Sequence, residues 1–394
     1  MTSQTGPDRT TVSCPQCGDT VPAAIFCGAC GAHLAAPAHG PGLRLHSYAA
    51  GSGEHVLHLA VVSSLFPHLP HRSRAPFRAA LLLVAALLVG LALLRWQAAL
   101  IAASAFGFPL LFQLYLQEAD VYDDLPVPRL LLGAGLGAVL GWAWSAGTAG
   151  TVRDGLAAGL LGGVSAHEAL IDGVLLPLGG FALMLAPALV LRLAAGSRPA
   201  ESLDGFLLGA IGALGFTVAA TLTRLAPQLR TGLVAPHAAR QDLLVEALLQ
   251  GGAVPLTAAA LGALVGATLW LRRRDPVHPG RVLTSPILAV VAGAVLFVGL
   301  GLVDIWQPDE SALLALHALV AATALLMLRI GVHAVLLHEQ HDVRIGGPQV
   351  CPHCEQVVPT MPFCPHCGSA ARAASRHRRS ALTVHVGPAE QATS

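Results

Sequence analysis

Two sets of cysteines have the types and spacing that bind a metal ion. Cys14-Pro-Gln-Cys17 is followed after nine residues by Cys27-Gly-Ala-Cys30, and Cys351-Pro-His-Cys354 is followed after nine residues by Cys364-Pro-His-Cys367. Four thiolates from two C-x-x-C motifs form a closed tetrahedral site, which is structural because no position is left open for water or substrate. The sequence therefore predicts two structural Zn²⁺ sites, with the ligands Cys14, Cys17, Cys27, Cys30, Cys351, Cys354, Cys364 and Cys367.

The two motifs align without a gap, as CPQCGDTVPAAIFCGACG and CPHCEQVVPTMPFCPHCG, and they use all eight cysteines of the chain. Gly18, Gly31 and Gly368 follow a second cysteine, where glycine permits a tight turn. A disulfide framework is the rival interpretation, but paired C-x-x-C motifs at matched spacing favour metal in a chain of this length. His353 and His366 lie inside the second motif, and we expect both to point outward because four sulfurs already complete the site.

The composition indicates a membrane protein. Of 394 residues, 54% are hydrophobic and 11% are charged, and the mean hydropathy is +0.64; soluble domains are roughly a quarter charged. The formal net charge is +1 and the cysteine motifs contain almost no arginine, so nothing attracts the phosphates of a nucleic acid. The chain has no lysine, a composition typical of a GC-rich bacterial genome such as that of an actinobacterium.

Eight segments are long and apolar enough to cross a bilayer, which takes about 20 residues as a helix. They are residues 77–94, 97–116, 130–150, 174–193, 203–225, 247–271, 286–303 and 312–337. A weaker segment, residues 155–171, could be half-inserted or re-entrant. The predicted fold class is an all-α polytopic membrane bundle of about eight transmembrane helices, flanked by two small cytosolic zinc ribbons.

An even number of spans returns the C-terminus to the side of the N-terminus. Thiols kept as zinc ligands favour a reducing compartment, so we expect both termini in the cytoplasm and the bundle in the plasma membrane. Arginines agree with the positive-inside rule, twelve against five. The predicted inner segments hold Arg72, Arg74, Arg78, Arg129, Arg192, Arg198, Arg272, Arg273, Arg274, Arg281, Arg329 and Arg344, and the outer ones Arg95, Arg153, Arg224, Arg230 and Arg240. The acidic inner loop 117–128 does not fit this bias.

The chain divides into five parts. These are an N-terminal zinc ribbon (1–36), a linker with scattered, solvated histidines (37–75), a transmembrane helical domain (76–338), a C-terminal zinc ribbon (339–370) and a basic, disordered tail (371–394). The tail holds Arg372, Arg376, His377, Arg378 and Arg379, which could contact anionic lipid or remain solvated; the sequence leaves this open.

Small residues recur four apart within the spans, at Gly133, Gly137 and Gly141 and again at Gly205 and Gly209. This spacing lets helix backbones approach closely in lipid. Prolines inside spans predict kinks, which often border cavities in membrane proteins. We find no internal repeat within the membrane region.

Few ionisable residues lie in the spans, and each is a candidate for function. A speculative intramembrane polar site consists of His167, Glu168, His317 and His333. A metalloprotease needs histidine and glutamate ligands on facing helices, and the chain contains no H-E-x-x-H motif. We favour the interpretation that these residues are structural or interfacial.

Two stretches of the membrane region resemble the PrsW-type intramembrane proteases of bacteria. They are Tyr115-Leu-Gln-Glu118-Ala-Asp120-Val-Tyr122-Asp123-Asp124-Leu-Pro126, which is similar to that family's acidic loop, and Leu203-Asp204-Gly205 through Gly215-Phe216, which is similar to its Asp-Gly helix. The resemblance implies a polytopic fold and a metalloprotease ancestry. The family's Glu-Glu-x-x-Lys motif is missing, and Ala219, Ala220 and Thr221 stand where it places Glu and Asn. No catalytic residue carries over, so the resemblance implies an inactive member.

The sequence thus favours a non-enzymatic membrane protein whose paired ribbons form a cytosolic interaction or regulatory module. Its expected partners are the lipid bilayer and an unidentified cytosolic protein, while nucleic acid is not expected and a homo-oligomer stays open. The alternatives are a PrsW-like intramembrane metalloprotease and, second, a transporter, which would contain a polar cavity near the middle of the bilayer.

Overall fold

The computed structural model describes residues 10–35, 61–69, 73–162, 165–195, 201–229, 239–271, 283–306, 309–339 and 345–384. Within these residues, eight helices or runs of consecutive helices are long and apolar enough to cross a membrane, and all eight predicted spans are confirmed. They are formed by α2 (Arg74–Leu93), α3 (Gln97–Glu118), α4 (Val127–Gly162), η3 with α6 (Ile171–Leu175 and Leu176–Ala194), α7 (Ser202–Leu229), α8, η4 and α9 (Arg240–Leu248, Leu249–Ala253 and Val254–Trp270), α10 (Pro286–Trp306) and α11 (Glu310–Glu339). The protein is an all-α, multi-pass membrane bundle.

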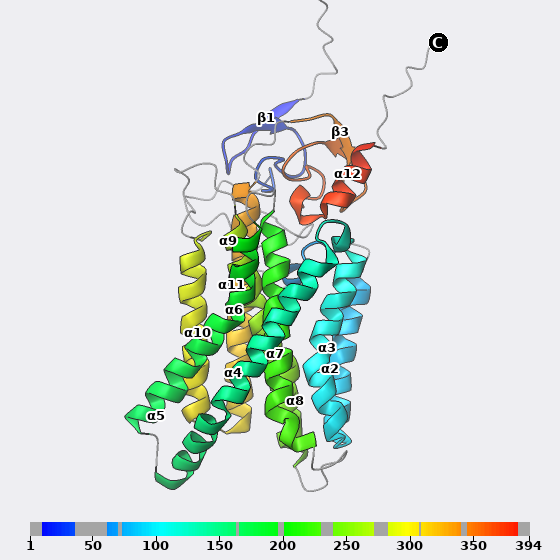
Figure 1. The fold of residues 1–394 in the computed structure, drawn as a ribbon. Coiled ribbons are helices and arrows are strands. Elements are labelled where there is room, and N and C mark those ends of the chain that lie inside the picture. Colours follow the sequence, from blue (N-terminus) through cyan, green and yellow to red (C-terminus); the bar gives the residue numbers. More distant parts are fainter. Residues whose placement is uncertain are drawn as a thin grey trace, which may run out of the picture.

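The weaker segment, residues 155–171, does not form a ninth crossing. Helix α4 continues without a break to Gly162, and the short helix α5 (Ala166–Leu170) leads directly into η3 and α6. In Figure 1 the chain turns around here, at the end of the bundle away from the strands. The number of crossings therefore stays even.

Helices α7 and α9 form the centre of the bundle. In their spans 72% and 78% of the residues are buried, against 17% for α2 and for α10 at the periphery. A Cβ added to Gly209 of α7 would lie 2.0 Å from the carbonyl oxygen of Gly262 in α9, and one added to Gly137 of α4 would lie 2.1 Å from that of Gly212 in α7. The glycines predicted from their spacing therefore let three helices pack backbone against backbone.

Two small modules lie together at one end of the bundle (Figure 1). The N-ribbon, residues 10–35, contains the antiparallel strands β1 (Thr11–Ser13) and β2 (Thr20–Pro22). The C-ribbon, residues 345–370, contains β3 (Pro348–Val350) and β4 (Val357–Pro359), also antiparallel. Because an even number of spans separates them, the two modules meet on the same side.

The first part of the predicted tail is ordered. After a 3-10 turn, η5 (Ala371–Ala373), helix α12 (Arg376–Val384) lies against the ribbon end of the bundle. This differs from the predicted disordered tail; residues 385–394 lie outside the described part. We call the two ribbons together with η5 and α12 the cap.

The described part of the linker packs against the bundle. Residues 61–65 form the short helix α1 (Val61–Leu65). Phe66 then inserts among aromatic rings, with centroid distances of 4.6 Å to Phe77 and 4.9 Å to Tyr115. His68 is only 5% exposed, so the prediction that it is solvated is wrong. The linker residues 37–60 and 70–72, with the other histidines, lie outside the described residues.

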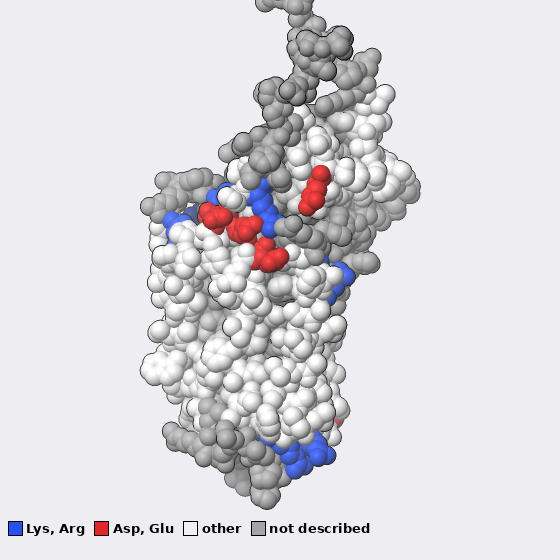
Figure 2. Space-filling model, turned by 90° about the vertical axis from the view of Figure 1, so that its right-hand side faces the viewer, with Lys and Arg blue, Asp and Glu red and all other residues white. Residues whose placement is uncertain are grey.

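Charge is distributed as expected for a protein in a bilayer. Figure 2 shows acidic and basic side chains near the ribbon end and basic ones at the opposite end, with an uncharged surface between them. Several inner arginines used for the topology prediction, including Arg72, Arg198 and residues 272–274, lie outside the described residues.

Candidate metal centres and cap

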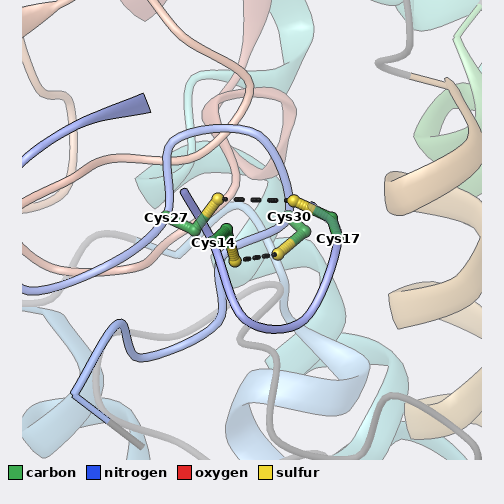
Figure 3. Close-up of side chains that lie close together, drawn as sticks. All are labelled: Cys14, Cys17, Cys27 and Cys30. Atoms are coloured by element: carbon green, nitrogen blue, oxygen red, sulfur yellow. Dashed lines mark hydrogen bonds between the residues drawn. The ribbon is translucent and has the colours of Figure 1, made fainter. Parts of the chain in front are cut away.

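In each ribbon the four sulfur atoms lie within 4.8 Å of one another. In the N-ribbon the Sγ atoms of Cys14 and Cys30 are 3.8 Å apart, as are those of Cys17 and Cys27 (Figure 3). Sulfurs placed tetrahedrally at about 2.3 Å from Zn²⁺ are separated by about 3.8 Å, whereas a disulfide bond measures about 2.05 Å. The side chains converge on a common centre, as a four-coordinate metal ion requires.

The C-ribbon repeats this arrangement. The sulfurs of Cys351 and Cys367 are 3.9 Å apart, and those of Cys354 and Cys364 are 3.8 Å apart. Hydrogen bonds from neighbouring thiols lower the pKa of Cys27 to about 4 and also lower the pKa of Cys367, whereas hydrogen bonding within the sets and burial raise the pKa of Cys30 and Cys351. Each set therefore favours one thiolate before metal binds, and the ion stabilises the others. Thiolate is the form of cysteine that binds metal, so both sets can hold an ion.

Each C-x-x-C motif closes with a residue in the left-handed conformation. Gly18, Gly31 and Gly368 have φ values of 79°, 73° and 74°. At the fourth equivalent position stands Glu355, with a φ of 60°. Its N–H donates to the carbonyl of Cys351 at 2.9 Å, as that of Gly18 donates to Cys14. A residue with a Cβ pays roughly 1–2 kcal/mol in this conformation, so the C-ribbon contains one strained turn.

The two ribbons bind each other through equivalent atoms. The N–H of Phe26 donates to the carbonyl oxygen of Pro365 at 2.9 Å, and the N–H of Phe363 donates to that of Gly28 at 2.9 Å. Gly28 also leaves room for Met361, because a Cβ on Gly28 would lie 2.2 Å from the methionine methyl. A self-complementary contact of this kind is typical of twofold dimers, and here one chain makes it with itself.

The cap is attached to the bundle through the start of α12. The carboxylate of Asp124, in the loop between α3 and α4, accepts the backbone N–H groups of Arg376 at 2.6 Å and His377 at 3.0 Å. These are orphan donors at the helix N-terminus, where a negative charge also meets the positive end of the helix dipole. The Arg376 Nη2 in turn lies 3.1 Å from both carboxylate oxygens of Asp204 at the start of α7.

Three further arginines of the cap pair with acidic groups at the ends of membrane helices. Arg378 Nε lies 2.8 Å from Asp120, Arg379 Nη2 lies 2.6 Å from Glu201, and Arg372 Nη1 lies 3.3 Å from Glu339. The acidic inner loop that did not fit the charge bias is therefore neutralised by arginines of the same chain. The sequence left open whether the basic cluster contacts lipid or remains solvated. Neither interpretation describes its four arginines, because their partners are carboxylates of the protein itself.

Two buried histidines lie near the junction of cap and bundle. Burial, together with the nearby Arg379 and His353, lowers the pKa of His68 to about 3. Burial likewise lowers the pKa of His353, to about 4. His353 is 8% exposed, so the prediction that it points outward is wrong, because the C-ribbon packs that side against the rest of the molecule; His366 is exposed, as predicted. The metal-binding sets found among the described residues contain cysteines alone.

Of the speculative intramembrane residues, the two histidines on α11 are not brought to one place. His167 is exposed on α5, and the side chain of Glu168 lies outside the described part. His317 and His333 are both buried on α11 but stand more than four turns apart, about 24 Å along the axis. They cannot bind the same ion.

His317 instead lines a cavity of about 560 Å³. The cavity lies among α4, α6, α7, α9, α10 and α11, and its other ionisable residues are Asp172, Arg224 and Asp304. The His317 Nε2 lies 3.5 Å from Asp304, while its Nδ1 lies 3.0 Å from the carbonyl oxygen of Leu313. The sequence identified His317 as an ionisable residue within a span. It could not identify the cavity, because the other lining residues stand on separate helices and no sequence spacing relates them to His317.

No protein-family model, curated protein or solved structure matches the chain. The resemblance to PrsW-type proteases stays a prediction. The residues that carry it make structural contacts: Asp120, Asp124 and Asp204 bind arginines of the cap, and Gly205 and Gly209 pack against α9. The described residues form a multi-pass membrane bundle that carries two sets of four cysteines, each able to hold a metal ion, at one end.

Proposed function

We propose that this protein is a non-enzymatic membrane protein whose paired zinc ribbons act as one cytosolic interaction and regulatory module. The proposal places the bundle in the plasma membrane with both termini in the cytoplasm, where the thiols stay reduced. The observation that carries it is the reciprocal pair of N–H bonds between the ribbons, made by Phe26 and Phe363. Two ribbons that worked separately would not need surfaces that fit each other. Two ribbons that work as a single unit do need them.

The contacts of the cap support a regulatory role. Its arginines reach the loop between α3 and α4, the start of α7 and the end of α11. A change that moves the cap therefore acts on several membrane helices at once. Since the fold of each ribbon depends on its ion, zinc supplies the rigidity that such coupling needs.

The outer surface of the ribbons offers a contact for a cytosolic protein. Ile25, Ile345 and Val357 are large hydrophobic residues that are 49%, 53% and 65% exposed. Exposed apolar groups on a small rigid module are typical of interaction sites when they cluster.

A photocrosslinking experiment tests the proposal in intact cells. A crosslinking amino acid at Ile25 or Val357 is expected to capture a specific protein, and the same residue at Val139, which is 62% exposed on the membrane-spanning part of α4, serves as the control. Capture should be lost when Cys14 and Cys17 are replaced by serine. Labelling of Cys14 or Cys351 by an impermeant maleimide from outside the cell would refute the cytosolic orientation.

The intramembrane metalloprotease alternative predicts convergence of His167, Glu168 and a histidine of α11. The described residues give it no such cluster. Purified protein is expected to cleave no membrane peptide, and Glu168→Gln to change no turnover. The transporter alternative is favoured by one observation, the cavity around His317, whose mainly apolar lining includes the ionisable residues Asp172, Arg224 and Asp304.

A further inference from the structure

We propose that the cavity around His317 binds an uncharged single-chain amphiphile of the monoacylglycerol type, with hydroxyls on its head and a carbonyl next to its apolar chain. The site is separate from the ribbons and from the function proposed for them. It is lined by six helices, and its volume of about 560 Å³ falls within the range of small-molecule sites, about 300–1,000 Å³. Its lining changes character from one end to the other, and this change orients the ligand.

The cavity is polar at the end away from the cap. Arg224 and Asp304 lie there, near the ends of α7 and α10, and both are exposed at the rim. Asp172 lies in η3, next to the point where the chain turns around between α4 and α6 (Figure 1). This end therefore offers several groups that can form hydrogen bonds with a ligand head.

The cavity becomes apolar toward the middle of the bundle. Phe216, Met184 and Ala258 line it there and are 7%, 2% and 1% exposed. Phe216 and Arg224 stand eight residues apart on α7, which is about 12 Å along the helix axis. An apolar chain gains free energy by leaving water for this inner part, while a polar head remains at the rim. A molecule with a head and a chain fits both ends at once.

The ionisable groups of the lining are engaged within the protein. The Nε2 of His317 lies 3.5 Å from Asp304, and Arg224 also attracts that carboxylate. Asp172 has an interaction partner of its own. A ligand with a net charge would have to compete with these interactions, and it would lose hydration in a space that is largely apolar. A head with hydroxyls avoids both penalties, because a hydroxyl can donate to a carboxylate and accept from a guanidinium without replacing either.

The hydroxyls of the lining point to a carbonyl in the ligand. Four threonines donate to backbone carbonyls of their own helices at 2.7–2.9 Å; they are Thr148, Thr217, Thr223 and Thr257. Ser145 differs, because its Oγ is buried and has no hydrogen-bond partner among the described residues. A buried hydroxyl without a partner is unfavourable. Since Ser145 lines the cavity, a carbonyl oxygen of the ligand can accept its proton.

Photolabelling of the full-length protein in nanodiscs tests the proposal. The probe is a monoacylglycerol with a diazirine at the end of its chain, and the labelled residues are located by mass spectrometry. We expect labelling on the inner part of the cavity, at residues such as Met184, Phe216 and Ala258, and excess unlabelled monoacylglycerol should abolish it. Labelling of lipid-facing residues such as Val139, which is 62% exposed, should not saturate. Labelling of lipid-facing residues alone would overturn the proposal.

Competitors with the same chain test the preference for an uncharged head. The corresponding alkanoate and alkylamine should each compete at least about tenfold more weakly than the monoacylglycerol. Equal competition by all three would show partition into an apolar space and would also overturn the proposal.

The contact at Ser145 is tested with a second ligand. Ser145→Ala should weaken competition by the monoacylglycerol about fivefold, which corresponds to about 1 kcal/mol. The alkylglycerol ether of the same length has no carbonyl, so its competition should not change in this variant. Ser104→Ala, a buried serine of α3 outside the cavity, is the matched control and should affect neither ligand. Equal effects of Ser145→Ala on the ester and the ether, or no effect on either, would refute the assigned carbonyl contact.

Discussion

Phe26 and Phe363 occupy equivalent positions in the two ribbons, and each donates its backbone N–H to a carbonyl of the other ribbon. The acceptors, Pro365 and Gly28, are equivalent as well. Because each ribbon supplies one donor and one acceptor, unfolding of either ribbon breaks both hydrogen bonds. Damage to one metal site should therefore loosen the whole cap.

The first prediction concerns the metal. Purified protein should contain about two Zn²⁺ per chain, and the double variant Cys14→Ser with Cys17→Ser should contain about one. The loss follows because two thiolates cannot hold a structural ion that requires four ligands. Elemental analysis measures the ratio. X-ray absorption should give four sulfurs at about 2.3 Å in the wild type; a zinc-bound water at either site would contradict the closed geometry.

The second prediction concerns the strained turn at Glu355. Glu355→Gly should stabilise the C-ribbon by about 1 kcal/mol, because glycine adopts positive φ without the cost that a Cβ imposes. The reverse change at the equivalent position, Gly18→Glu, should destabilise the N-ribbon by a similar amount. Competition with a zinc chelator measures the effect of both variants. The measured quantity is the chelator concentration that removes one ion, compared with that for the wild type. Shifts in the same direction for the two variants would contradict this account.

The third prediction tests the close packing of α4 on α7. Gly137→Val should prevent stable folding or cost several kcal/mol, since a Cβ there would lie 2.1 Å from a backbone oxygen that cannot move aside. Gly135→Val, on the same helix, is the control, because nothing lies within 4 Å of its Cβ position. The yield of monodisperse protein in detergent and its thermal unfolding compare the two. Similar behaviour of both variants would show that α4 and α7 do not approach as closely as described.

The fourth prediction concerns the attachment of α12. Trypsin cleaves after arginine, and α12 offers Arg376, Arg378 and Arg379. Asp124→Asn with Asp204→Asn should raise the rate of cleavage in α12 about tenfold or more, because the cap then opens more often. Salt at 0.5 M should raise the wild-type rate as well, since it screens the partly exposed pairs. Asp309→Asn serves as the control and should leave the rate unchanged.

The fifth prediction is a pH dependence that arises from His68. Its pKa in the folded protein is about 3, below the ordinary value of about 6.5. Between these values the unfolded chain binds more protons, so the contribution of His68 to stability is present above about pH 6.5 and is lost as the pH falls toward 3. His68→Gln cannot titrate, so thermal unfolding should depend less on pH between 7 and 5 than in the wild type. An unchanged slope would show that His68 does not stay neutral in the fold.

The sequence predicted the parts of this molecule that follow from local patterns. The eight spans follow from apolar length, and the metal ligands follow from the spacing of cysteines such as Cys14 and Cys17. The pairing of the ribbons could not be predicted, because it depends on the path of eight helices between Phe26 and Phe363. The role of the acidic loop was missed for the same reason: Asp124 and Arg376 are far apart in the chain and each looks like a solvated charge on its own.

The cavity illustrates the same limit from inside the membrane. His317 was a candidate because ionisable residues are rare in spans, but its distance from His333 along α11 excludes the cluster that the sequence suggested. The other ionisable residues of the cavity are Asp172, Arg224 and Asp304, and they stand on three other segments of the chain. Only the packing of the helices brings them to one cavity.

The order in which the cap is assembled has a consequence for biosynthesis. The N-ribbon leaves the ribosome before any span, whereas residues 345–384 emerge after all eight, so the first ribbon waits for its partner throughout membrane insertion. A chain that stops before residue 345, or that inserts with one crossing too few, cannot place Phe363 against Gly28. Such a product keeps the carboxylates of Asp124 and Asp204 without their arginines and the apolar face around Phe26 uncovered. The contact between the two ends of the chain thus distinguishes a complete, correctly threaded molecule from a defective one, and it gives cellular proteases a difference they can detect.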